Sequence, residues 1–298
     1  MDRKLVSFDW AMKKILRQKA NFGILEGFLT ELLKFDVKIE EILESEANQE
    51  TEDDKFNRVD LLAKNENDEL ILIEVQHSSE IDYFHRMLFG VSKLITEYIK
   101  KGKGYAKVKK VYSVNIVYFA LGQGEDYVYY GKTIFRGLHN NKDILKPSYR
   151  QKEDFNIEEI SDIYPEYYIL RVNQFNDIAK STLDEWIYFL KNEEIKTQFK
   201  AKGLDKAKEA LDMMKLGDKD RAVYKRREEN KIYKESLLYT AERKGLKKGL
   251  EEGKKSAKIE IAKSLLDILD IETISLKTGL TIEEIILLTD VTQTKKKL

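Results

Sequence analysis

Cysteine is absent from this chain, and proline occurs only twice in its 298 residues. Without cysteine there can be no disulfide bond and no thiolate metal site, and the absence fits an intracellular protein. With so few prolines and 42% hydrophobic residues, the composition is typical of a folded globular protein rather than a disordered one. The length allows one large core and a smaller appendage.

Long hydrophobic runs are missing as well. No apolar segment approaches the roughly 20 residues that a membrane span requires. Charged side chains interrupt residues 1–15, which therefore lack the apolar centre of a secretory signal. We expect a cytoplasmic protein with no membrane partner.

The chain also has no excess charge of either sign, since 53 Lys and Arg balance 53 Asp and Glu. The charge is unevenly placed. Residues 36–54 hold nine acids and one lysine, a local balance of −8, whereas residues 219–258 hold fourteen basic and seven acidic residues, a balance of +7. The basic segment could supply phosphate contacts to DNA. The alternative is a solvated helix with internal ion pairs, because glutamates are interspersed among the bases.

Apolar periodicity predicts an α/β core in the first two thirds of the chain. Residues 21–35, and a segment from residue 79 to about 101, carry apolar side chains at the i, i+3, i+4 spacing of amphipathic helices. The predicted strands share apolar or alternating patterns bounded by turn residues. They cover residues 37–43, 58–64, 69–76, 108–119, 127–130 and 167–172.

Beyond residue 181 the pattern is entirely helical. Ser181 is the predicted N-cap of a helix over residues 182–191. Residues 206–216 and 219–269 are rich in Lys, Glu, Ala and Leu, which are strong helix formers.

Three glycines, Gly245, Gly249 and Gly253, recur every four residues within the longest predicted helix. Each interior glycine costs about 1 kcal/mol relative to alanine. Their recurrence indicates either close backbone packing or a flexible connector. We predict a domain over residues 1–200 and a helical regulatory or oligomerisation region over residues 201–298.

The last 30 residues hold a weaker motif. Residues 271–278 and 281–288 predict two short helices around Gly279, with Thr281 and Glu284 forming a capping box. Such a pair could be a helix-turn-helix, but the second helix offers two acids and no basic or amide side chain for reading bases. We favour a packing or oligomerisation hairpin, and we expect a homo-oligomer, such as a dimer formed through the C-terminal helices.

A predicted hairpin carries two carboxylates, Asp60 before it and Glu74 near its end. Residues 65–68 favour a turn, so the flanking strands should pair antiparallel. Counting back from a pair between Lys64 and Glu69 places Asp60 opposite the residue before Glu74, about 5 Å away at Cβ. With a bulge that turns both carboxylates to one face, they could hold one divalent cation.

The alternative is that both acids are simply solvated. Against this, Glu74 directly follows the apolar run 70–73, which indicates a strand buried on both faces. A carboxylate in such a strand must be paired, protonated or bound to a metal. The two-residue period of a strand places Gln76 on the same face as Glu74.

Four segments and one acid occur in an order that resembles a known family. They are residues 8–16, Asp60, residues 74–76, residues 84–94 and the glycine-spaced residues 241–253. The set resembles the PD-(D/E)XK nuclease superfamily. More narrowly, it resembles the Rpn group of recombination-promoting nucleases, also described as PD-(D/E)XK family transposases.

This resemblance implies a restriction-endonuclease-like fold: a mixed β-sheet flanked by helices, here followed by an all-α C-terminal region. It also implies one or two Mg²⁺ ions bound by Asp60, Glu74 and the backbone carbonyl of Val75, because Mg²⁺ prefers oxygen ligands. Superfamily members often use a further acid on an N-terminal helix. We rank Asp9 above Glu26 for that position.

The sequence departs from the motif at two positions. Val59 stands where the motif has proline, and Gln76 stands where it has the lysine that orients the attacking water and supports the developing charge. Gln76 can hold a water molecule but brings no positive charge. Arg86 and Lys93 are the candidate replacements, since they lie seven residues apart on one face of the next predicted helix. The alternative for Arg86 is a structural pair with a carboxylate.

Two functions follow from these expectations. The first is a Mg²⁺-dependent DNA endonuclease connected with recombination, mobile elements or phage defence. The second is a nuclease-derived module that binds DNA or protein and has little catalytic activity. The retained pair of Asp60 and Glu74 favours the first, because a purely structural descendant does not need a carboxylate in a buried strand.

Overall fold

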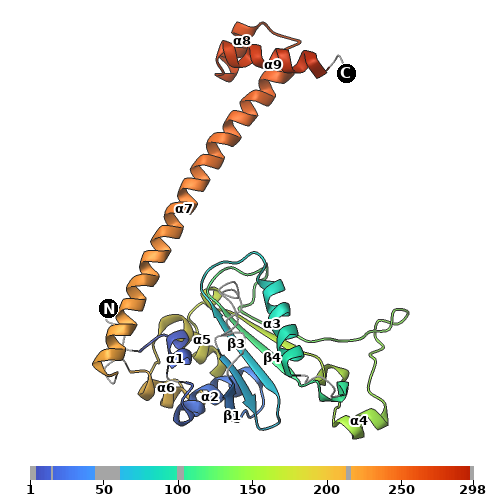
Figure 1. Ribbon diagram of the computed structural model, residues 1–298, viewed down its shortest axis with the longest axis vertical. Coiled ribbons are helices and arrows are strands. Elements are labelled where there is room, and N and C mark those ends of the chain that lie inside the picture. The colour runs from blue at the N-terminus through green and yellow to red at the C-terminus, as the bar shows by residue number, and fades with distance from the viewer. Residues whose placement is uncertain (1–4, 15, 44–60, 99–103, 213–215, 296–298) are drawn as a thin grey trace. The chain divides into compact units, whose positions relative to one another are not determined.

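The structure, a computed structural model, describes residues 5–14, 16–43, 61–98, 104–212 and 216–295 (Figure 1). Its contacts divide the chain into two compact units, Met1–Arg221 and Ala222–Leu298. The first unit contains the sheet and the second is helical, so the predicted α/β core with an all-α C-terminal region is confirmed. The predicted domain boundary after residue 200 stays a prediction.

The first unit is built on a six-stranded mixed sheet of order β1-β2-β3-β4-β6-β5. The strands are β1 (Ile39–Leu43), β2 (Leu61–Asn65), β3 (Leu70–Gln76), β4 (Val111–Val117), β5 (Val128–Gly131) and β6 (Glu166–Arg171). The strands β3, β4 and β6 run parallel, and the other three pair antiparallel with their neighbours. The central strands β3 and β4 are buried on both faces, which explains their continuous apolar sequences.

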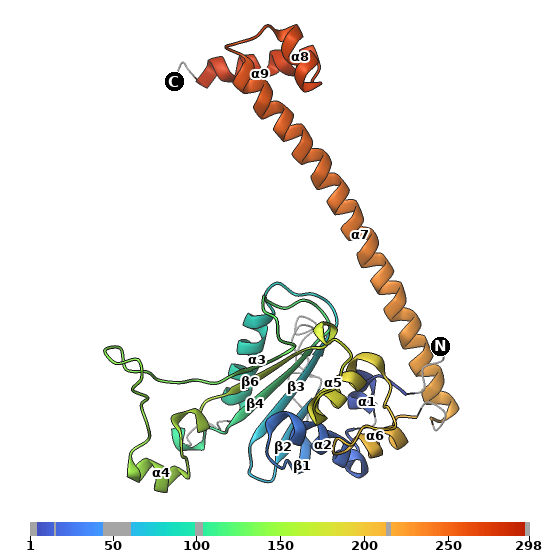
Figure 2. The same cartoon turned by 180° about the vertical axis from the view of Figure 1, so that it is seen from behind.

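One face of the sheet is covered by α3 (Tyr83–Tyr98) (Figures 1 and 2). The second half of this helix packs Val91 and Leu94 against Leu70 and Leu72 near the start of β3. Its first turns pack Tyr83 and Met87 against Val117 at the end of β4. The helix therefore runs antiparallel to β3 and begins at the carboxyl end of the strand.

The opposite face is covered by α1 (Phe8–Lys14), α2 (Phe22–Leu33), α5 (Thr182–Asn192) and α6 (Leu204–Ala210) (Figures 1 and 2). Their core is aromatic: the ring of Phe8 lies 5.4 Å from Phe28 and 6.2 Å from Trp186, measured between centroids. The predicted N-cap Ser181 is confirmed, since its side chain accepts a hydrogen bond from the backbone of Asp184. Short 3₁₀ helices cover Lys19–Asn21, Tyr105–Lys107, Ile160–Asp162 and Val172–Gln174.

The hairpin of β2 and β3 forms as predicted, but its predicted register was wrong by one residue. Lys64 pairs with Leu70 rather than with Glu69. Leu61 consequently pairs with Ile73.

The physical reason is a turn shorter than the predicted one. The backbone N–H of Asn65 donates to the carbonyl of Glu69 at 3.1 Å, which keeps Asn65 in the strand. The side-chain oxygen of Asn65 accepts from the backbone of Asn67 and Glu69 at 3.1 and 2.9 Å. Asp68 adopts a φ of 63°, in the left-handed region that asparagine and aspartate tolerate.

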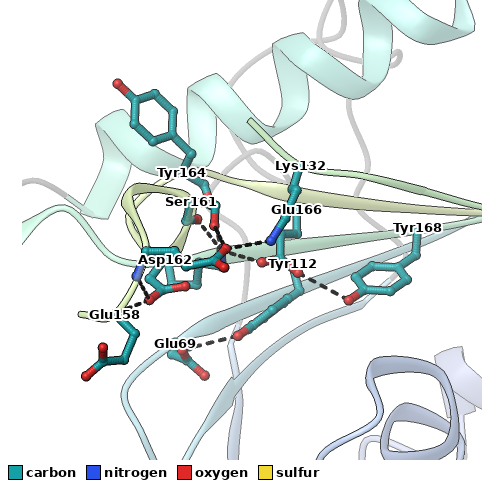
Figure 3. Close-up of polar contacts among 11 residues, drawn as sticks. Glu69, Tyr112, Lys132, Glu158, Ser161, Asp162, Tyr164, Glu166 and Tyr168 are labelled. Carbon is teal, nitrogen blue, oxygen red and sulfur yellow. Dashed lines mark hydrogen bonds and ion pairs between the residues drawn. The ribbon is translucent and has the colours of Figure 1, made fainter. Parts of the chain in front are cut away.

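The segment between β5 and β6 contains α4 (Tyr149–Phe155) and is joined to the sheet through Lys110. The Nζ of this buried lysine donates to the carbonyls of Ser161 and Tyr164 at 2.7 and 2.8 Å, and to Glu166 Oε1 at 2.8 Å. Tyr168 donates a further hydrogen bond to the other oxygen of Glu166 (Figure 3). These bonds satisfy a charge that would otherwise be costly to bury.

The helical region comprises α7 (Asp218–Leu265), α8 (Ile271–Thr278) and α9 (Ile282–Lys295). The end of α7 packs Ala262 against Ile274, Leu280 and Ile285 in a small apolar core. The predicted capping box is confirmed: Thr281 N donates to Glu284, and Glu284 N donates to the Thr281 hydroxyl.

The helix α7 continues through all three recurrent glycines, and an added Cβ at any of them would meet nothing within 4 Å. Within the part of the chain that the structure describes, the backbone at these glycines is therefore not closely packed against another segment, and the alternative of a flexible connector stays a prediction. Within the same residues, no helix is both long and apolar enough to cross a membrane.

Two alanine substitutions should change stability in opposite directions. A Cβ at Gly27 would lie 2.2 Å from the carbonyl oxygen of Lys202, so Gly27→Ala should lower the free energy of unfolding by about 2 kcal/mol. At Gly249 the space is open, and Gly249→Ala should stabilise α7 by about 1 kcal/mol. Thermal unfolding followed by circular dichroism measures both, and shifts of the same sign would contradict the packing described.

Lys110→Met should lower the free energy of unfolding by about 3 kcal/mol, because it leaves Glu166 and two carbonyls without their shared donor. The matched control is Lys132→Met, which removes an ion pair to the exposed Glu159. Denaturant titration should separate the two variants clearly. Equal midpoints would show that Lys110 does not anchor the segment.

Candidate functional site

The candidate site lies where β3 ends and α3 begins. The two-residue period places Glu74 and Gln76 on the face of β3 that carries Leu70 and Leu72, and those leucines pack against α3. Glu74 is only 8% exposed, as expected for a carboxylate at the end of a strand buried on both faces. Gln76 is half-buried at the last position of the strand.

Arg86, on the first turn of α3, is the basic residue that the fold brings to Glu74. Burial lowers the pKa of the Arg86 guanidinium, while the negative charges of Glu74 and Glu80 raise it, and the net effect is a raised pKa. The Nη1 atom donates to both carboxylate oxygens of Glu80, at 2.9 and 3.1 Å. Arg86 is therefore a fixed positive charge that interacts with two carboxylates.

Glu80 is a site residue that the sequence analysis missed. Its Oε1 atom accepts a hydrogen bond from Gln76 Nε2 as well as from Arg86. Glu80 lies in the loop between β3 and α3. In a loop, neither the helical period nor the strand period predicts the direction of a side chain. The only sequence signal is its position, four residues after Gln76 and six before Arg86.

Lys93 is placed differently from Arg86. Seven residues of helix advance it by roughly 10 Å along the axis, toward the start of β3. Its Nζ lies 3.9 Å from Glu97 Oε1, one turn further along α3. The geometry thus brings Arg86, rather than Lys93, to the end of the strand that carries Glu74.

Asp9, on α1, reaches the same end of β3 through His77. Asp9 is 7% exposed, and its Oδ2 atom lies 3.7 Å from His77 Nε2. The His77 ring stacks on Tyr118 with centroids 4.3 Å apart. Burial raises the pKa of the Tyr118 hydroxyl, and the charges of Glu193 and Asp9 add to this effect. The His77 side chain is partly buried between these groups.

Glu26, the lower-ranked acid, has another role. Its Oε1 atom accepts a hydrogen bond from the backbone N–H of Ile39 at 2.9 Å, which fixes the start of β1. This contact places Glu26 at the edge strand β1, where Ile39 pairs with Asn65 beside the hairpin turn, at the end of the sheet away from Glu74.

Asp60 lies outside the described residues. The described hairpin pairs Leu61, which directly follows Asp60 in sequence, with Ile73, which directly precedes Glu74. Among the residues that the structure describes, no group of three or more histidine and acidic side chains is arranged to hold a metal ion. The acids at this end of the sheet nevertheless offer the oxygen donors that Mg²⁺ prefers, and Val75 lies beside Glu74 in the same strand.

The chain was compared with family models, curated proteins and solved structures, and the region that matches a family includes the whole candidate site. No curated protein and no solved structure matches the chain. A family model described as PD-(D/E)XK nuclease family transposase matches residues 6–241, which include the entire sheet, α3 and every candidate site residue. The chain belongs to the PD-(D/E)XK nuclease family transposases.

Proposed function

We propose that this protein is a metal-dependent DNA endonuclease that hydrolyses phosphodiester bonds. The observation that carries the proposal is the buried carboxylate of Glu74 at the end of β3, whose negative charge acts on the guanidinium of Arg86. Membership of a nuclease family supports the reaction class. A connection with recombination, mobile elements or phage defence is part of the proposal.

The proposed metal ligands are Asp60, Glu74 and the backbone carbonyl of Val75, with Asp9 as a further acid. These donors are all hard oxygen atoms, which fit Mg²⁺. When bound, the metal supplies an activated water and neutralises charge on the phosphate. Asp9 contacts His77, which suits it to the rim of the site.

Arg86 and Gln76 divide the task of the motif lysine in this proposal. The amide of Gln76 can orient a water molecule by hydrogen bonds, since it both donates and accepts. The guanidinium of Arg86 can stabilise the negative charge that develops on the phosphate, because it is permanently charged and forked. Lys93, paired with Glu97, is not assigned to this task.

The basic segment over residues 219–258 is proposed to contribute phosphate contacts. Most of its side chains on α7 are exposed, so they are accessible to a nucleic-acid backbone. Such contacts strengthen binding without reading sequence. A homo-oligomer formed through the C-terminal helices would present more than one such segment.

The first test is cleavage of supercoiled plasmid DNA in Mg²⁺. The wild-type protein should nick the plasmid, and Asp60→Ala and Glu74→Ala should reduce nicking to background, because each removes a proposed metal ligand. DNA binding, measured by fluorescence anisotropy, should persist in both variants. Equal nicking by all three proteins would refute the catalytic assignment. DNA binding without nicking by the wild type would favour a catalytically weak binding module.

The second test compares the two candidate cations. Arg86→Ala should lower kcat by about 10²-fold, since it removes a charge that stabilises the transition state. Lys93→Ala should leave kcat close to that of the wild type, because Lys93 lies about two helical turns away. The reverse ranking in a plasmid cleavage assay would assign the role to Lys93.

A further inference from the structure

Glu80 joins the two polar side chains that replace the motif lysine. One of its oxygens accepts hydrogen bonds from both Gln76 and Arg86. Its other oxygen accepts a second bond from Arg86 Nη1 at 3.1 Å. Glu80 is partly buried, with 29% of its side chain exposed, and Arg86 is 25% exposed. Partial burial strengthens such charged hydrogen bonds relative to bonds in water.

Two carboxylates, those of Glu74 and Glu80, act on the guanidinium of Arg86. Its raised pKa reflects the charges of both Glu74 and Glu80, but its described hydrogen bonds go to Glu80. The buried Nε atom has no hydrogen-bond partner among the described residues. The two hydrogen bonds from Nη1 to Glu80 orient the guanidinium, while the charge of Glu74 acts on it electrostatically.

We propose that Glu80 is a positioning residue that holds Arg86 and Gln76 in place and keeps the guanidinium from pairing fully with Glu74. This inference rests on the proposed function, because it assigns to Glu74 the role of metal ligand. Glu74 is the other carboxylate whose charge acts on Arg86, so loss of Glu80 would favour pairing of the guanidinium with Glu74. A full ion pair there would compete with a divalent cation for the same carboxylate, and the amide of Gln76 would lose its acceptor.

A simpler role for Glu80 is to stabilise the start of α3, since acids near a helix N-terminus interact favourably with the helix dipole. That role predicts a change in stability alone. The positioning role predicts an effect on metal binding that depends on Arg86. A double-mutant cycle separates the two roles, because it isolates the coupling between two residues.

The cycle uses Mn²⁺ as the probe, with free Mn²⁺ measured by electron paramagnetic resonance in the full-length protein. Glu80→Ala should weaken Mn²⁺ binding by about tenfold, a coupling of ordinary size for neighbouring charges. In the Arg86→Ala background, the same change should alter affinity by less than about twofold. Equal weakening in both backgrounds would overturn the proposal, because Glu80 would then act on the metal directly.

A second measurement needs neither metal nor DNA. The Arg86 Nε–H resonance in a ¹⁵N-labelled sample should shift in Glu80→Gln and change little in Glu74→Gln. The opposite pattern would show that Glu74 holds the guanidinium and would overturn the proposal. Because this measurement does not depend on cleavage, it distinguishes failure of the positioning role from failure of the nuclease assignment.

Kinetics provide the third measurement, with a matched control on the same helix. Glu80→Ala should lower kcat and leave KM for DNA unchanged, and Glu80→Gln should retain part of the activity, since its amide oxygen still accepts from Arg86. The control is Glu97→Ala, which removes the partner of Lys93. The Glu97 side chain is about as exposed as that of Glu80, and this variant should have the kcat and KM of the wild type. Wild-type kcat in Glu80→Ala would contradict a positioning role. A wild-type protein that does not cleave would instead refute the nuclease proposal.

Discussion

The burial of one carboxylate, that of Glu74, is the constraint on which the site depends. A strand with apolar side chains on both faces cannot end in a buried charge unless that charge is balanced. The packing of α3 provides the balance, because the apolar contacts of its two halves with β3 and β4 orient the helix antiparallel to β3. That orientation brings Arg86 to the carboxyl end of the strand.

Gln76 stands where the motif has a lysine, so the proposed catalytic role requires a positive charge from another element. Gln76 can form hydrogen bonds but is uncharged, and Arg86 has the charge but comes from a different element. Glu80 accepts hydrogen bonds from both and so links the two side chains that we propose to replace the lysine.

The helical region is stabilised differently from the sheet, because little of it is buried. Its small apolar core is confined to the end of α7 and the two helices that follow, while most of α7 is polar and exposed. A long helix that is mostly exposed relies on intrinsic propensity and on ion pairs along its surface, each of which contributes little. Interior glycines lower that propensity further, so α7 has a small margin of stability near residues 245–253.

The sequence by itself determined the strands, the helices other than α1 and α4, and the burial of Glu74. Apolar periodicity located the strands, and the run before Glu74 indicated a strand covered on both faces, because a two-sided core leaves no polar alternation. The helix caps at Ser181 and Thr281 could be predicted from sequence, because each depends on a contact with the residue three positions later. Only the tertiary structure decided the hairpin register, which the side chain of Asn65 set, and the meeting of Gln76, Glu80 and Arg86. Those contacts depend on how a loop and a helix pack against the sheet, and local patterns carry no information about such packing.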